Sequence, residues 1–433
     1  MLATIIICAI VFIALTASII FFPSIKIKNL QIGSYWLIAL VGAVLLISFG
    51  AAPLDVVFDA LTANSAINPL KILALFFSMT FLSVYLDEVG LFRFLAKKAV
   101  AKVGSKQISL FLVLYALTAV LTVFTSNDIV ILTLTPFICF FCKNARINPL
   151  PYLVGEFAAA NTWSMMLVIG NPTNIYLATS AGIGFLDYFK VMALPTLLSG
   201  IAELLLIVLL FFRHLKAPLS PQEDDFAVKN KVGLTVGVFH LFVCLVFLAI
   251  SGYLGIEMWL ASVVCALSLL VFAIVFGVFD RGDRRAAVNC FSRLPYQLIP
   301  FVLSMFVVVV ALNEQGITQK IAALLGEQNS VLTYGVSSYL VANVINNIPM
   351  SMLYCSITSS LSGAEFLRAI YASVVGSNVG AFLTPIGALA GIMFTKLTKE
   401  HQVDYSFKRF IGYGAAISLP TLAVALLVLS VLI

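Results

Sequence analysis

Charge is scarce in this sequence. Only 10% of its 433 residues are Asp, Glu, Lys or Arg, whereas 62% are hydrophobic, and the mean hydropathy is +1.10. Soluble domains carry about 25% charged and about 45–50% apolar residues. A water-soluble fold is therefore excluded. We expect an all-α integral membrane protein, with the lipid bilayer and not a nucleic acid as its partner.

The sequence also lacks a disulfide framework, a zinc motif and a cleavable leader. Its cysteines lie in or beside apolar runs without metal-ligand spacing: Cys8, Cys139, Cys142, Cys244, Cys265, Cys290 and Cys355. The first apolar run has no basic segment before it, and Lys26 and Lys28 follow it. We expect a retained helix with its N-terminus outside, and no metal or other cofactor.

Long apolar runs recur along the whole chain. Runs of about 18 to 25 residues can cross about 30 Å of hydrocarbon as helices. We predict ten transmembrane helices near residues 2–22, 34–51, 70–88, 151–182, 191–213, 232–251, 258–279, 295–312, 366–395 and 408–433. Two further apolar stretches, 107–142 and 330–361, are predicted to be re-entrant hairpins.

The positions of Lys and Arg predict the topology, because cytoplasmic loops carry an excess of positive charge. If each hairpin returns to the side from which it starts, few of the 25 basic residues lie outside: Lys71, Lys190, Lys320 and Arg368. A full crossing by 107–142 would place most of the Lys and Arg residues that come after it in the chain outside the cell, against this rule. We therefore expect both termini outside the cell and the loop 214–231 in the cytoplasm.

The two halves of the sequence resemble each other. Residues 86–91 (LDEVGL) end one predicted helix, and residues 312–317 (LNEQGI) end its counterpart. An amphipathic stretch, a hairpin with an Asn-rich turn and an interrupted helix follow each of them. We predict two repeats, 1–213 with an inward-opening hairpin and 232–433 with an outward-opening hairpin, joined by 214–231. Because each repeat crosses the membrane five times, the second is inverted relative to the first.

The interruptions read GNPTN at residues 170–174 and TPIG at residues 384–387. Irregular backbone at membrane depth occurs only where it faces protein or a water-filled cavity. Proline removes an amide donor, and glycine permits a tight turn. The freed backbone groups can bind an ion, so Gly170, Pro172, Pro385 and Gly387 are candidate coupling-ion residues. Inverted repeats with broken helices that meet near the membrane midplane are typical of secondary transporters.

Polar side chains at the hairpin turns and near the breaks predict a substrate site. Hydroxyl and amide groups both donate and accept hydrogen bonds, and helix N-termini add unpaired amides. The candidate substrate-binding residues are Ser126, Asn127, Asn171, Thr173, Asn174, Asn346, Asn347, Ser377, Asn378 and Thr384. A lone Pro or Gly simply kinks a membrane helix, but polar breaks at matching places in both halves favour a functional role.

Asp128 is an ionisable candidate beside the first hairpin turn. A carboxylate at membrane depth is a functional candidate by default, so we predict that it carries a proton or binds the coupling cation. The alternative is a capping role at a helix start. Glu156 and Glu203 are weaker candidates, for which hydrogen bonding between helices is an equal alternative. Cys139 and Cys142 carry thiols that suit soft metals, but inert packing is favoured.

These motifs resemble the arsenical pump (ArsB) branch of the ion transporter superfamily, which also contains NhaD-type sodium/proton antiporters, citrate–metal transporters and divalent-anion/sodium symporters. The resemblance runs from about residue 35 to the C-terminus and is carried by residues 86–90, 127–136, 170–174, 346–349 and 380–390. It implies a homodimer and a site built from the hairpin tips and breaks at Asn127, Asp128, Asn171, Thr173, Asn174, Asn346, Asn347, Asn378, Thr384 and Pro385.

We predict a secondary active transporter, not an enzyme, that moves a small inorganic ion or oxyacid across the cytoplasmic membrane. Proton-coupled antiport is preferred, in the manner of an arsenite pump or a sodium/proton antiporter. The alternative is a sodium-coupled symporter that imports citrate, dicarboxylate or sulfate. No Lys or Arg that could bind such an anion lies near the two hairpin turns or the two helix breaks. A membrane enzyme or a channel would need a metal cluster, a nucleophile–base pair or a ring of charges, and none is visible in the sequence.

Overall fold

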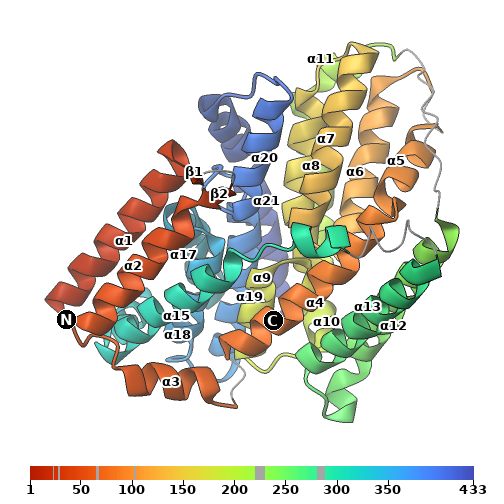
Figure 1. Ribbon diagram of the computed structural model, residues 1–433. Helices are drawn as coiled ribbons and strands as arrows, with labels where there is room; N and C mark the ends of the chain where they lie inside the picture. The colour runs from red at the N-terminus through yellow and green to blue at the C-terminus, as the bar shows by residue number, and fades with distance from the viewer. Residues whose placement is uncertain (23, 28–29, 65–67, 102–103, 220–229, 280–287) are drawn as a thin grey trace.

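The computed structural model describes residues 1–22, 24–27, 30–64, 68–101, 104–219, 230–279 and 288–433. The chain folds almost entirely into helices (Figure 1). The first part contains α1 (Leu2–Phe21), β1 (Ser24–Ile27), β2 (Leu30–Gly33), α2 (Ser34–Ser48), α3 (Leu54–Thr62), α4 (Pro69–Glu88), α5 (Leu91–Ala101), α6 (Gln107–Phe124), α7 (Asn127–Ala145), α8 (Leu150–Trp163), η1 (Ser164–Met166), η2 (Val168–Gly170), α9 (Pro172–Ser180), α10 (Phe185–Leu210) and α11 (Phe212–Leu215).

The second part contains α12 (Lys231–Leu254), α13 (Met258–Phe279), α15 (Leu298–Glu314), α16 (Ile317–Leu325), α17 (Ser330–Ile345), α18 (Asn347–Thr358), α19 (Gly363–Gly380), α20 (Leu389–Glu400) and α21 (Phe407–Leu432). Of the predicted linker 214–231, residues 220–229 lie outside the described residues. Just before them, Pro218 forms an isolated antiparallel bridge with Lys106.

Eight helices of the described chain are long and apolar enough to cross a membrane: α4, α6, α7, α10, α12, α13, α21 and a span at Val288–Glu314 that includes α15. The predicted multi-pass helical fold is therefore present. The predicted count of ten crossings and two re-entrant hairpins remains a prediction. The sets differ because the predicted crossings at 151–182 and 366–395 are broken into shorter helices and the apolar parts of α1 and α2 are shorter than 18 residues, whereas the first hairpin's arms, α6 and α7, are 18 and 19 residues long. Length and apolarity alone do not distinguish a hairpin arm from a crossing helix.

A short β-hairpin that was not predicted from the sequence lies between α1 and α2. Strands β1 and β2 pair antiparallel, with Ser24 opposite Gly33 and Ile27 opposite Leu30. The first strand reads Ser-Ile-Lys-Ile, an alternation of polar and β-branched residues that favours a strand. The run is only four residues long, so the apolar helices on either side obscured it.

The order of elements repeats along the chain. In the first part, α4 is followed by the short helix α5, the helix pair α6–α7, a broken helix (α8, η1, η2 and α9) and the long helix α10. In the second part, α15 is followed by α16, the pair α17–α18, a broken helix (α19 and α20) and α21. The pairs α1–α2 and α12–α13 precede these series and lie on opposite sides of the molecule (Figure 1).

The two series pack across each other in matching ways. Helix α2 packs against α15, and α13 packs against α4. In each part, the second helix of the hairpin pair packs on the broken helix of the other part. Helix α7 packs on α20, and α18 packs on α9. Helices α10 and α21 also pack together. This exchange brings hairpin tips and helix breaks, far apart in sequence, into the interior.

Candidate functional site

The first hairpin turns at Thr125 and Ser126, between the end of α6 and the start of α7. The Asn127 side chain there is buried. Its Nδ2 donates to Asn161 Oδ1 on α8 at 3.1 Å, and its Oδ1 accepts from the Asp128 amide at 2.9 Å. The tip is therefore tied to the turn of α8 that precedes the first helix break.

The first break is held open by side chains. Helix α8 ends at Trp163, two short 3₁₀ turns follow, and α9 begins at Pro172. Asn171 caps α9 by accepting from the Thr173 amide at 3.2 Å. The Nδ2 of Asn174 donates to the carbonyls of Ser164 at 2.8 Å and Leu167 at 3.2 Å. These bonds satisfy carbonyls freed by the break, as backbone at membrane depth requires.

Asn378 on α19 joins the first break to the second part of the chain. Its Oδ1 accepts from Ser164 Oγ at 2.8 Å and Asn171 Nδ2 at 3.0 Å. Its Nδ2 donates to Asn174 Oδ1 at 2.7 Å and to the Val374 carbonyl at 2.8 Å. All of the side chains in this group are buried. We call Ser164, Asn171, Asn174 and Asn378 the central amide cluster.

The second hairpin tip docks on the second break. Asn346 has φ +74°, a conformation that costs a non-glycine residue energy and persists only where contacts enforce it. Its Nδ2 donates to the Ile386 carbonyl at 2.9 Å, and its Oδ1 accepts from the Ile348 amide at 3.3 Å. The buried Asn347 donates its amide to the Gly387 carbonyl at 3.0 Å. A Cβ on Gly387 would lie 2.7 Å from the Gly380 carbonyl oxygen, so the break needs glycine there.

Thr384, also in the second break, is half-buried. Its amide and its hydroxyl donate to Asn343 Oδ1 at 3.1 and 2.7 Å. The Nδ2 of Asn343 donates to the carbonyls of Tyr339 and Gly380, each at 2.9 Å. Asn343 and Ser164 are not among the residues predicted from the sequence. The signal for Asn343 was its place one helical turn before the Asn346 tip, whereas nothing in the sequence pointed to Ser164.

Three of the predicted substrate-binding hydroxyls are buried and have no hydrogen-bond partner: Ser126, Thr173 and Ser377. They stand at the first hairpin tip, in the first break and beside Asn378 on α19. A buried polar group without a partner costs about 1–3 kcal/mol. Such groups are rare in folded proteins, and these three hydroxyls are free to bond a ligand, although buried atoms without a partner also occur elsewhere in the described chain, for example in Thr122 and Tyr334.

Asp128 lies in the first turn of α7 and is half-buried. Among the described residues, no Lys, Arg or His forms an ion pair with it. An acid with no cationic partner at a hairpin tip suits a group that binds a proton or a cation, which remains a prediction for Asp128.

The remaining candidates have separate environments. Both carboxylate oxygens of Glu156 accept from the Thr135 hydroxyl on α7, at 2.9 and 3.0 Å, a bond that joins two helices. Glu203 lies in a different cluster on α10. Cys139 and Cys142 are buried and free on the outgoing arm α7, several turns from the tip. Of the predicted coupling-ion residues, Gly170, Pro172, Pro385 and Gly387 all lie buried in the two breaks.

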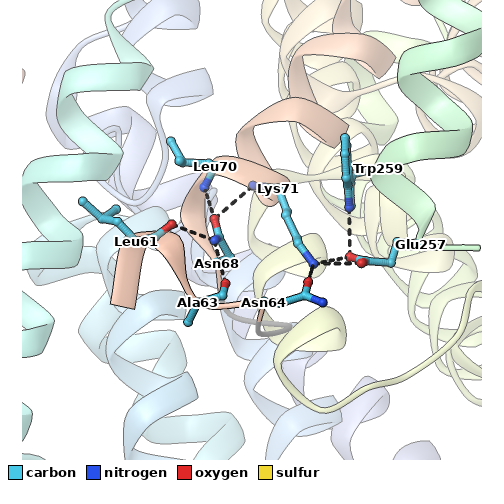
Figure 2. A network of polar contacts seen from close by, with 8 residues as sticks. All are labelled: Leu61, Ala63, Asn64, Asn68, Leu70, Lys71, Glu257 and Trp259. Carbon is cyan, nitrogen blue, oxygen red and sulfur yellow. Dashed lines mark hydrogen bonds and ion pairs between the residues drawn. The ribbon is translucent and has the colours of Figure 1, made fainter. Parts of the chain in front are cut away.

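A pocket lies at the far end of α9 from the central amide cluster. Its lining includes Ile175 and Thr179 of α9 and Lys71 at the start of α4. Lys71 Nζ contacts both carboxylate oxygens of Glu257, at 2.6 and 2.8 Å, and Trp259 Nε1 donates to the same carboxylate at 2.9 Å (Figure 2). The Lys71 hydrogen bonds and ion pair lower the pKa of the Glu257 carboxyl. The pair connects α4 to the loop between α12 and α13.

Comparison with solved structures gives the fold. The YdaH transporter of Alcanivorax borkumensis aligns over 99% of this chain and 97% of its own, with a TM-score of 0.55 and 15% identity. The MtrF protein of Neisseria gonorrhoeae, described among antimetabolite efflux pumps, aligns over 100% of this chain and 94% of its own, with a TM-score of 0.54 and 14% identity. At such identities, the likeness is one of fold.

Sequence comparison gives the family. The arsenical pump membrane protein of Escherichia coli is 26% identical over 378 residues, covering 82% of this chain and 85% of the relative. That of Yersinia enterocolitica is 27% identical with the same coverage, and an uncharacterized transporter of Mycobacterium tuberculosis is 24% identical over 405 residues, covering 90% and 91%. The CitMHS family model, described as a citrate transporter, matches residues 19–376. The chain therefore belongs to the CitMHS family of the ion transporter superfamily and is a multi-pass membrane transporter, not an enzyme.

Proposed function

We propose that this transporter moves a small, uncharged or weakly acidic inorganic oxyacid out of the cell in exchange for protons. The observation that carries the proposal is the chemistry of the central amide cluster and the three hydroxyls around it. They offer both donors and acceptors and carry no charge. Among the described residues, no Lys or Arg is bonded to any predicted substrate-binding residue.

An arsenite-like substrate fits this chemistry. Arsenous acid is an uncharged molecule with three hydroxyl groups at neutral pH, each of which donates and accepts hydrogen bonds. The unpartnered hydroxyls of Ser126, Thr173 and Ser377 would pair with such groups. The arsenical pump relatives in Escherichia coli and Yersinia enterocolitica add support for efflux. A sodium/proton antiporter would use the same neutral site with Asp128 as the ion ligand.

The second candidate is a sodium-coupled symporter that imports citrate or another dicarboxylate. The description of the family model as a citrate transporter favours it. Four helix N-termini, at the starts of α7, α9, α18 and α20, lie beside the hairpin tips and breaks and offer amides to an anion. A multiply charged anion would nevertheless be left without a cationic partner at the site.

Alternating access supplies the mechanism that we propose. The repeated order of elements and the exchange packing of α7 on α20 and α18 on α9 support two inverted repeats, 1–213 and 232–433, that exchange roles between inward- and outward-facing states. In this arrangement, hairpin 107–142 opens inward and hairpin 330–361 opens outward. The termini lie outside, and the linker 214–231 is cytoplasmic.

Complementation of three sets of bacterial strains tests the proposal: strains sensitive to arsenite, strains sensitive to sodium, and strains unable to import citrate or succinate. Rescue of growth on arsenite alone, together with arsenite uptake into everted vesicles that depends on a proton gradient, is the expected result. Growth on citrate or succinate alone, with uptake that requires sodium, would replace the proposal with the second candidate.

A further inference from the structure

A buried carboxyl group lies apart from the substrate site, between α6, α8 and α10. Glu203 on α10 is 0% exposed. Its Oε1 lies 2.9 Å from the Tyr115 hydroxyl of α6, and its Oε2 accepts from the Thr162 hydroxyl of α8. Trp163 Nε1 donates to the Tyr115 hydroxyl at 3.2 Å. Among the described residues, no cation forms an ion pair with Glu203.

The hydrogens available to this cluster allow two arrangements. The Tyr115 hydroxyl has one hydrogen, yet it lies 2.7 Å from the Gly200 carbonyl oxygen and 2.9 Å from Glu203 Oε1. If Tyr115 donates to Glu203, the carboxylate is ionised and accepts from the Tyr115 and Thr162 hydroxyls, but its charge has no cationic partner in the membrane interior. If Tyr115 donates to the Gly200 carbonyl, which only accepts, a hydrogen on Glu203 fills the second contact and the acid is neutral. The cost of the uncompensated charge favours the neutral acid.

The same turn of helix connects this carboxyl to the substrate site. Asn161 bonds the first hairpin tip, Thr162 bonds Glu203, and Ser164 bonds Asn378 of the central amide cluster. Trp163 belongs to the same turn. A Cβ added to Gly200 of α10 would lie only 2.6 Å from the nearest atom of the Trp163 indole, so α8 and α10 are in close contact there. Residues 161–164 therefore bond both the substrate site and the carboxyl cluster.

We propose that Glu203 is a second proton-binding site, which takes up the coupling proton when the turn 161–164 closes against α10. The proton comes from water on one side of the membrane, forms the O–H bond of the carboxyl, and returns to water on the other side when the cluster opens. No other bond changes. The proposal rests on the proposed function, because it takes from it that a proton is the coupling ion. The partners of the carboxyl are hydrogen-bond donors, which suits a proton better than a metal cation.

The other titratable groups on the elements around α10 are engaged elsewhere or distant. On α8, Glu156 bonds Thr135 and Tyr152 bonds Gln107. On α21, Arg409 pairs with Asp404, and on α12, His240 contacts Ser268. No hydrogen bond or ion pair joins Glu203 to the remaining groups of these elements and of α11, which are Arg213, His214, Lys231, Cys244, Tyr253, Lys408 and Tyr413.

The test uses the full-length protein and the variant Glu203→Gln, whose amide reproduces the neutral acid. Infrared spectra at neutral pH should show a carbonyl stretching component of a protonated carboxylic acid that Glu203→Gln removes. The matched control Glu156→Gln, also a fully buried acid, should leave that component in place. In proteoliposomes with arsenite as the probe, a one-unit pH gradient should drive about tenfold accumulation per coupled proton. Glu203→Gln should abolish it while keeping arsenite exchange at equal pH.

Unchanged accumulation in Glu203→Gln, or an infrared spectrum identical to that of the wild type, would overturn the proposal. If the wild type moves no arsenite but shows the Glu203 component, the proposed function fails and the proton site stands. If Glu203→Gln does not fold, Tyr115→Phe replaces it. Removing the hydroxyl that accepts the carboxyl hydrogen should shift the component to higher frequency, and an unshifted component would refute the assignment.

Discussion

Asn378 on α19 donates its side-chain Nδ2 to the Oδ1 of Asn174 on α9 at 2.7 Å. The two residues are 204 positions apart in the chain, and each belongs to a different part of the repeated element order. Asn378 also accepts from two groups at the first break. This single side chain therefore ties the first break to α19 through three hydrogen bonds, in addition to the packing of α19 on α8 and α9.

Replacing Asn378 with Ala should weaken apparent substrate affinity by about 10- to 100-fold, because the loss of buried hydrogen-bond partners costs about 1–3 kcal/mol. The measurement is the concentration dependence of substrate exchange in proteoliposomes. A matched control is Asn68→Ala, which removes the cap of α4 and whose side chain, among the described residues, bonds only the backbone of Leu61, Ala63, Leu70 and Lys71. It should lower thermal stability and leave affinity unchanged. Equal affinity loss in both variants would show that the Asn378 effect is general.

Ser377→Ala should separate binding from stability. Because the Ser377 hydroxyl is buried without a partner, its removal should leave the melting temperature unchanged or raise it while substrate affinity falls. The control is Ser373→Ala, one turn away on the same helix, whose hydroxyl bonds the Ala369 carbonyl at 2.7 Å. That variant should lose stability and keep affinity. The reverse pattern would remove Ser377 from the site.

Asp128→Asn should abolish proton-coupled transport in everted vesicles while the protein remains folded and inserted, because the amide cannot exchange a proton. Asp55→Asn serves as a control, since Asp55 is an exposed residue on α3. Flux should be measured with and without a proton gradient, and protein amount by immunoblot. Wild-type proton-driven flux in the Asp128 variant would leave Asp128 with only its capping role.

The pair Lys71–Glu257 predicts a small, acid-sensitive contribution to stability. Lys71 depresses the pKa of Glu257 in the folded protein, so the contribution is present above the unfolded-state pKa of about 4.3. It is lost as the pH falls through the lower folded-state value. The Glu257 side chain is 50% exposed, and such pairs contribute under about 1 kcal/mol.

Glu257→Gln should therefore lower the melting temperature of the detergent-solubilised protein at pH 7, and the difference from the wild type should shrink in acid. The double variant with Lys71→Gln should be more stable than the sum of the two single changes predicts, because each single change removes the same interaction. Strictly additive losses would show that the pair is not coupled.

The amino-acid sequence determined the class of protein and the positions of its irregular segments. Apolar runs dictate membrane helices because lipid leaves no alternative partner for the backbone. The turns before Asn127 and Asn347 and the breaks at Pro172 and Pro385 could be read from local residue chemistry, since Asn, Gly and Pro act on the backbone within a few positions.

Only the tertiary structure decided which polar groups meet. The bonds of Asn378 to the first break, of Asn343 to Thr384, and of Glu203 to Tyr115 and Thr162 all join separate helices. An almost uniformly apolar helix does not reveal which face meets a neighbour, because lipid and protein interior have similar polarity. That 107–142 and 330–361 are re-entrant hairpins follows from the positions of Lys and Arg in the sequence and stays a prediction, because the length and apolarity of α6 and α7 suit a crossing helix equally well.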